Sequence, residues 1–198
     1  MKQHRVIILF MFFSVTILLL IGTLNHPLFH FLVELGTIFI GIMIFLMAVN
    51  SNVFSSKNVL LSLGVAYLYI CMFDFMSLIT YSEIELIRST SNMSNGYWMG
   101  ARFLESVSIM TVFFLYNKEI RPSQLVQHAI YIGFFLVSFI LLNFSLIDSL
   151  FDFYGTSSLS IVFVLSIILF YLMGVVFTKK SKLGKEQKIL ILVGVLLK

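Results

Sequence analysis

The chain has 198 residues, of which 60% are hydrophobic and only 11% are charged, and its mean hydropathy is +1.04. Because a soluble domain carries about 25% charged residues, this composition excludes a water-soluble globular protein and predicts an integral membrane protein. The net charge of +4 comes from lysines and arginines that flank apolar segments, which argues against nucleic-acid binding.

Six apolar segments are each long enough to span a membrane as a helix, since about 20 residues cross a bilayer. A further apolar segment begins near Glu186 and reaches Lys198 after twelve residues, too few to cross. The first segment has a basic start but lacks a small-residue cleavage site, so we expect a retained helix rather than a signal peptide. The sequence predicts an all-α, polytopic transmembrane bundle with six complete helices and a truncated seventh. The six segments are 6–24, 28–49, 58–81, 97–116, 125–147 and 157–178.

The basic residues between these segments are distributed very unevenly. If the N-terminus is cytoplasmic, the outer segments hold Arg88 alone, whereas ten basic residues fall on the inner side. Cytoplasmic loops of membrane proteins are enriched in lysine and arginine, so we predict a multi-pass protein of the cell membrane with a cytoplasmic N-terminus. The inner residues are Lys2, Arg5, Lys57, Lys118, Arg121, Lys179, Lys180, Lys182, Lys185 and Lys188.

Four ionisable side chains lie inside the apolar segments, namely Glu34, Asp74, Arg102 and Glu105. A charge in hydrocarbon is costly, so such residues usually face the bundle interior, pair with one another and mark a functional site. With the predicted topology all four lie roughly 7–12 Å below the outer surface, at 1.5 Å per residue. We therefore expect segments two to four to pack together, with Arg102 within hydrogen-bonding reach of at least one carboxylate.

Two interpretations of this layer remain open. In the first, Arg102 pairs with carboxylates only to orient the helices. In the second, the layer is a binding pocket, because one arginine cannot neutralise three carboxylates and a proton, a cation or a basic ligand would complete the balance. His30 lies one helical turn from Glu34 and would stand toward the mouth of such a pocket. The predicted ligand-binding residues are His30, Glu34, Asp74, Arg102 and Glu105.

Other chemistries have weaker support in the sequence. His30, Glu34 and Asp74 lack the further Cys or His that would complete a metal site, no histidine pair is placed across helices for haem, and we expect no cofactor. No catalytic or nucleotide-binding motif is present, so we expect no enzymatic activity in this chain. The remaining residues singled out have structural interpretations: Gly36, Gly41 and Gly64 mark close helix packing, Tyr97 and Trp98 are interfacial aromatics, and Tyr67 is a packing residue.

Three stretches of the sequence carry a distinctive pattern: HPLFHFLVELGTIFIGIMIFLMAVNS at 26–51, LLSLGVAYLYICMFDFMSLITY at 60–81 and YWMGARFLESVSIM at 97–110. They resemble the MASE3 family of bacterial membrane-associated sensor domains. The resemblance is specific over 26–110, whereas the later segments are similar only as hydrophobic helices. The sequence departs from the family at Ser77 or a close neighbour, where the family often has histidine, so this protein is expected to bind any ligand differently or not at all if that histidine is a ligand-binding residue.

The resemblance implies that residues 1–198 form a sensory input domain, followed in the intact protein by further helices and a cytoplasmic output domain. The output would be a histidine kinase, as in two-component systems, or a diguanylate cyclase, and the full-length protein is expected to be a homodimer. The expected partners are the lipid bilayer and an unidentified small ligand. The alternative is a small transporter or ion-conducting protein that uses the buried carboxylates. Transporters have helices broken near the midplane, whereas Pro27 and Pro122 both lie between segments, which favours sensing.

Overall fold

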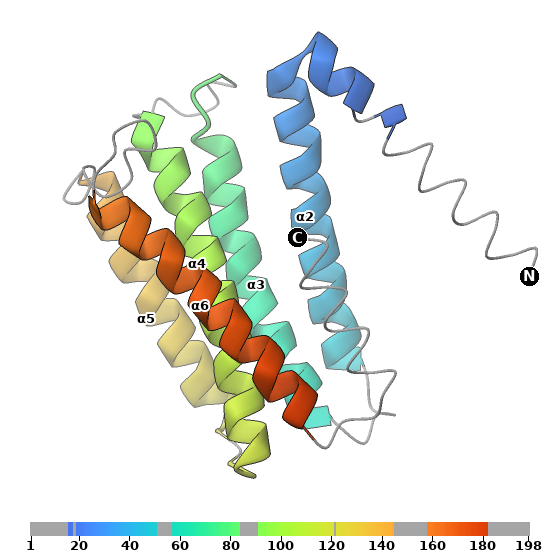
Figure 1. Cartoon of the computed structure of the whole chain (residues 1–198), viewed down its shortest axis with the longest axis vertical. Helices are drawn as coiled ribbons and strands as arrows, with labels where there is room; N and C mark the ends of the chain where they lie inside the picture. The colour runs from blue at the N-terminus through green and yellow to red at the C-terminus, as the bar shows by residue number, and fades with distance from the viewer. Residues whose placement is uncertain are drawn as a thin grey trace, which may run out of the picture.

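The computed structural model describes residues 16–17, 19–50, 57–83, 91–120, 122–144 and 158–181. These residues lie in helices and in the turns next to their ends, without a β-strand among them, so the predicted all-α bundle is confirmed (Figure 1). The helices are α2 (His26–Asn50), α3 (Lys57–Ile79), α4 (Ser91–Asn117), α5 (Gln124–Asn143) and α6 (Ser158–Lys180).

These five helices correspond to predicted segments two to six, and each is long and apolar enough to cross a membrane. The predicted count of six complete helices and a truncated seventh differs from the five described. Residues 19–24 of the first segment are helical, while the rest of that segment and the whole of the seventh lie outside the described residues. α4 begins at Ser91, six residues before the predicted start, because its first turns are polar and hydropathy alone does not detect them.

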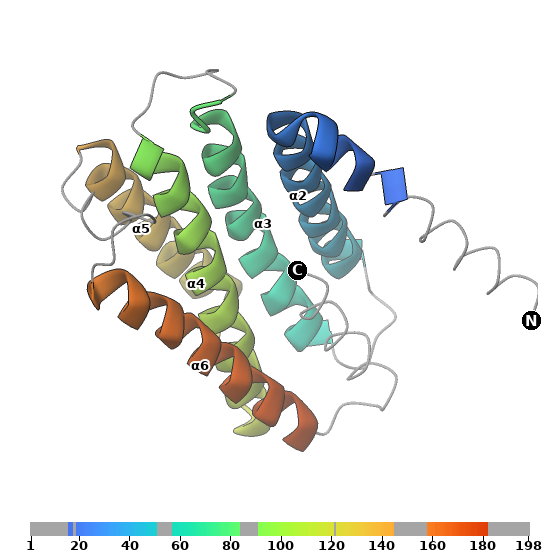
Figure 2. The ribbon, with the colours of Figure 1, turned by 45° about the horizontal axis from the view of Figure 1, so that its top comes forward.

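α3 is the central helix of the bundle. It packs against α2 on one side and α4 on the other, while α5 contacts both α3 and α4, and α6 crosses α4 (Figures 1 and 2). The membrane-spanning part of α3 is 61% buried within the protein, whereas only 11% of α5 and of α6 is buried. The outer helices therefore present large apolar side chains outward, as expected where lipid is the solvent.

Side chains and backbone bonds define several helix ends. Before α2, the Asn25 side chain accepts a hydrogen bond from the backbone N–H of Leu28 (3.0 Å), and Ser123 caps α5 in the same way. After α4, Glu119 adopts a left-handed backbone with φ 61°. The N–H groups of Glu119 and Ile120 then donate to the carbonyls of Tyr116 and Leu115, which is the Schellman pattern of helix termination.

Close approach of α2 to α3 depends on two glycines. A methyl group at Gly41 would clash with Cys71, and one at Gly64 would clash with Ala48, so both positions bring the helices together as predicted. The same prediction for Gly36 is wrong, because a methyl group there would meet no atom of the described residues within 4 Å. This tight α2–α3 contact fixes the height at which Glu34 on α2 faces α3.

Candidate functional site

Arg102 is the centre of a buried ion-pair network between α3 and α4. Its Nη2 atom lies 2.7 and 2.9 Å from the two carboxylate oxygens of Asp74, and its Nη1 atom lies 2.6 Å from Oε2 of Glu105. The Asp74 side chain is 3% exposed and that of Glu105 is fully buried. The prediction that Arg102 binds at least one of the carboxylates is confirmed, and the network holds two carboxylates for one guanidinium.

Two tyrosines also donate hydrogen bonds to Glu105. The hydroxyl of Tyr67 on α3 donates to Oε1 of Glu105 at 2.8 Å, and that of Tyr171 on α6 donates to Oε2 at 2.9 Å. Hydrogen bonds to a carboxylate stabilise its charged form, so the tyrosines support the excess negative charge. Tyr171 also attaches α6 to the network across 66 residues of sequence.

Glu34 belongs to a second polar cluster, nearer the start of α2. Its Oε1 atom lies 3.3 Å from Nε2 of His30 and accepts a hydrogen bond from Ser77 Oγ at 3.2 Å. Ser94 on α4 joins this cluster by donating to the Ser77 carbonyl at 2.9 Å. His30 packs against the ring of Tyr81, with ring centroids 4.2 Å apart, and its side chain is 32% exposed. The Glu34 cluster, made of His30, Glu34, Ser77 and Ser94, thus extends from a partly open end into the bundle.

The two clusters are connected through α3 rather than by a direct contact between charges. Ser77, which binds Glu34, and Asp74, which binds Arg102, are three residues apart and therefore one turn apart on one face of α3. The expectation that all four charges form a single paired layer is therefore only partly met. The early start of α4 places Arg102 and Glu105 about 17 and 21 Å from Ser91, well inside the bundle, whereas Glu34 lies about 12 Å from His26.

Two buried polar atoms have no hydrogen-bond partner among the described residues. They are Oε2 of Glu34, an acceptor, and Nε of Arg102, a donor. The Glu34 side chain is only 9% exposed. Since buried polar groups are nearly always paired, each unpaired atom requires an explanation such as water, a proton or a ligand. The charge imbalance inferred from the sequence is thus divided between the two clusters: Asp74 and Glu105 share Arg102, whereas the ionisable neighbour of Glu34 is His30.

Several residues of the site were not assigned to it from the sequence. Tyr67 binds Glu105 instead of serving only for packing, and Tyr97 is fully buried and accepts a hydrogen bond from Asn143, so its interfacial assignment is wrong. Tyr171 had no distinguishing signal, because a tyrosine in an apolar helix fits packing equally well. Ser77 was noted only as the position of a missing histidine, and here it is the hydrogen-bond donor to Glu34.

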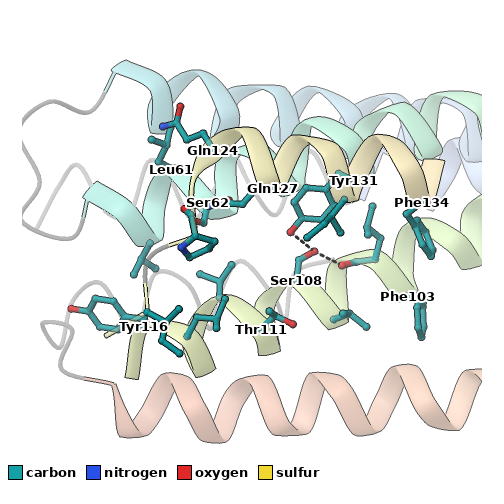
Figure 3. A pocket seen from close by; sticks show the side chains of 18 of the residues that line it. Leu61, Ser62, Phe103, Ser108, Thr111, Tyr116, Gln124, Gln127, Tyr131 and Phe134 are labelled. Carbon is teal, nitrogen blue, oxygen red and sulfur yellow. Dashed lines mark hydrogen bonds between the residues drawn. The ribbon is translucent and has the colours of Figure 1, made fainter. Parts of the chain in front are cut away.

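A separate elongated pocket lies between α3, α4 and α5 and contains none of the five predicted site residues (Figure 3). Its volume is about 570 Å³. Among the described residues, no three His, Cys, Asp or Glu side chains are grouped closely enough to hold a metal ion.

Comparison with known proteins identifies the family. The sequence profile of MASE3, described as a membrane-associated sensor domain, matches residues 21–197, nearly the whole chain. The chain belongs to this family. No curated protein and no solved structure matches it. The chain is thus a multi-pass membrane domain with a sensory role, and the family match extends the sequence resemblance from 26–110 through α5 and α6.

Proposed function

We propose that this MASE3 domain is the input module of a bacterial signal-transduction protein and that the Glu34 cluster is where the stimulus acts. The observation that carries this proposal is the buried Glu34 carboxylate, which has one oxygen unpaired within the described structure and a partly exposed histidine beside it. A proton or a small hydrogen-bond donor that enters past His30 would satisfy Glu34 Oε2. The output would be a cytoplasmic histidine kinase or diguanylate cyclase, in a homodimeric full-length protein.

The contacts support a route from this cluster to the later helices. A change in the charge of Glu34 alters its bond to Ser77 and so biases the position of α3. Asp74, one turn away, transfers that bias to Arg102 and Glu105 on α4, and Tyr171 transfers it to α6. A stimulus shifts an equilibrium only by its difference in affinity for two states, and the exchange of partners in this network would supply that difference.

Glu34→Gln tests the proposal, because glutamine keeps the shape of the side chain but holds it neutral at every pH. In full-length protein the parent output should change when the external pH is varied between about 5 and 8 or when ligand is added. Glu34→Gln should express normally and keep its output near the level of the acid end, with a flattened response. The readout is the output activity of the full-length protein in membranes, measured across this pH range. Asp74→Asn should also change this pH response.

The matched control is Glu83→Gln, the same change in an exposed carboxylate near His26. It should respond like the parent. If Glu34→Gln and Asp74→Asn both fold and also signal like the parent under every stimulus, the charged residues are structural and the sensing site lies elsewhere.

We also propose that the N-terminus and the α4–α5 turn are cytoplasmic. This topology places the Glu34 cluster on the outer side of the membrane. Reporter fusions after Lys57, Lys118 and Lys182 should all report a cytoplasmic location, and a fusion after Glu83 an external one. The basic residues of the inner segments provide the physical reason. An external signal at any of the three lysines would contradict both the topology and the assignment of the Glu34 cluster to the outer half.

A further inference from the structure

The elongated pocket between α3, α4 and α5 is partly open to the surroundings and runs along α4 and α5. Its α4 wall runs along one helix face from Phe103 to Tyr116, a length of about 20 Å at 1.5 Å per residue. At the inner end, the rings of Phe103 and Phe134 stack with centroids 6.1 Å apart. At the other end stands Gln124, which is exposed (Figure 3), and the exposed Ile120 of the α4–α5 turn also lines the pocket. The pocket therefore leads from the α4–α5 turn toward the middle of the bundle.

The dimensions of the pocket limit what can occupy it. A volume of about 570 Å³ spread over about 20 Å gives a mean cross-section of about 28 Å². A helix with its side chains is about 10 Å across or more, so the pocket suits a thinner occupant better. A single chain of methylene groups, whose carbons approach neighbouring atoms to about 4 Å, fits this width along the whole length.

Several polar side chains in the wall are already bonded to protein atoms, while Ser62 and Thr111 also line the pocket. The Tyr131 hydroxyl donates to Ser108 Oγ at 3.0 Å, and Ser108 itself donates to the carbonyl of Leu104. The Gln127 amide donates to the carbonyl of Pro122 at 3.1 Å. Because these donors are already bonded to protein atoms, an occupant without polar groups leaves none of them unsatisfied. The polar and charged groups at the open end instead include Glu119, Gln124 and the adjacent exposed Lys118.

We propose that this pocket binds one acyl chain of a membrane phospholipid, with the phosphate of the headgroup near Lys118. The open end lies at the α4–α5 turn, where an inner-leaflet lipid has its headgroup in the predicted topology, and lysine attracts lipid phosphate there. Insertion of the chain fills the space between α5 and the α3–α4 pair. The bound lipid thereby becomes part of the packing of α5, so the lipid composition of the membrane affects this domain independently of the Glu34 cluster.

Photochemical labelling tests this proposal. The full protein is placed in lipid nanodiscs that contain a phospholipid with a photoreactive group in the middle of one acyl chain, and labelled residues are mapped by mass spectrometry. Labels should concentrate on the α4 and α5 residues that line the pocket, such as Val107 and Tyr131, several-fold above the exposed faces of α2 and α6. Excess unlabelled phospholipid should compete for these positions.

Val107→Trp fills the pocket and should reduce the pocket labelling several-fold, and Val107→Phe provides a smaller substitution should the first fail to fold. Ile132→Trp, on the exposed face of α5, is the control and should leave that labelling unchanged. Labels spread evenly over all lipid-facing surfaces would overturn the proposal. So would labelling of the pocket by a photoreactive free fatty acid but not by the phospholipid, or cross-links between α5 and another protein segment that occupies the pocket. None of these outcomes depends on the response of Glu34→Gln.

Discussion

Arg102→Ala is expected to be among the most destabilising single substitutions in this domain. It removes the basic side chain that binds both Asp74 and Glu105 and so takes a contacting countercharge from two buried carboxylates. Stranding one partner of a buried ion pair costs on the order of 3–5 kcal/mol in soluble proteins. For a chain of this size that corresponds to a fall in the unfolding temperature on the order of 10 °C. This fall is measured by heating the detergent-solubilised protein and recording the loss of its monodisperse fraction with temperature.

Two comparison variants distinguish the cost of leaving buried carboxylates unpaired from the cost of removing a basic side chain. Lys180→Ala removes an exposed basic residue at the end of α6 and should change the unfolding temperature little. The combination of Arg102→Gln with Asp74→Asn and Glu105→Gln removes every charge of the network and should recover part of the lost stability, because no carboxylate remains stranded. If Arg102→Ala is as stable as Lys180→Ala, the network contributes nothing to the fold and its geometry needs another explanation.

The sequence identified the helices well because a membrane span is recognised by length and hydropathy alone. The predicted boundaries were wrong where polar residues extend a helix, as at the start of α4, which begins at Ser91. The fold class and the central ion pairs were predictable for a related reason. A charge in an apolar segment needs a partner, and Arg102 was the only cation available to Asp74 and Glu105 within those segments.

The rest of the site depends on which helix faces meet, and no pattern in one sequence encodes this. Tyr171 reaches Glu105 only because α6 crosses α4, where Gly174 admits Ile109 closely and Asn117 donates to the carbonyl of Phe177. The separation of Glu34 from Arg102 was also not predictable, because a common depth does not establish contact. Depth follows from residue counting, whereas the partner of Glu34 follows from the rotation of α2 about its axis, which Gly41 and Gly64 help to set.

Tyr171→Phe is expected to uncouple α6 from the ion-pair network while leaving the fold nearly intact. The substitution removes one hydroxyl and its bond to Glu105, which retains Arg102 and Tyr67 as partners. Hydrogen bonds between membrane helices contribute on the order of 1 kcal/mol, so the loss of stability should be far smaller than for Arg102→Ala. The response of α6 to a stimulus at Glu34 should nevertheless be weakened, because the Tyr171 hydroxyl makes the hydrogen bond that joins α6 to the network in the described structure.

Spin labels at Lys118 and Lys180, at the exposed ends of α4 and α6, provide a readout that needs no output domain. In the parent protein the distance distribution between them should change with pH, and Glu34→Gln should hold it in the acid-end form. In Tyr171→Phe the same pH change should produce a smaller shift or none. Tyr131→Phe, which removes a tyrosine hydroxyl bonded to Ser108 outside the network, is the matched control and should respond like the parent. A full shift in Tyr171→Phe would show that α6 follows α4 through packing at Gly174 and Asn117 alone, and the proposed route through Glu105 would then be wrong.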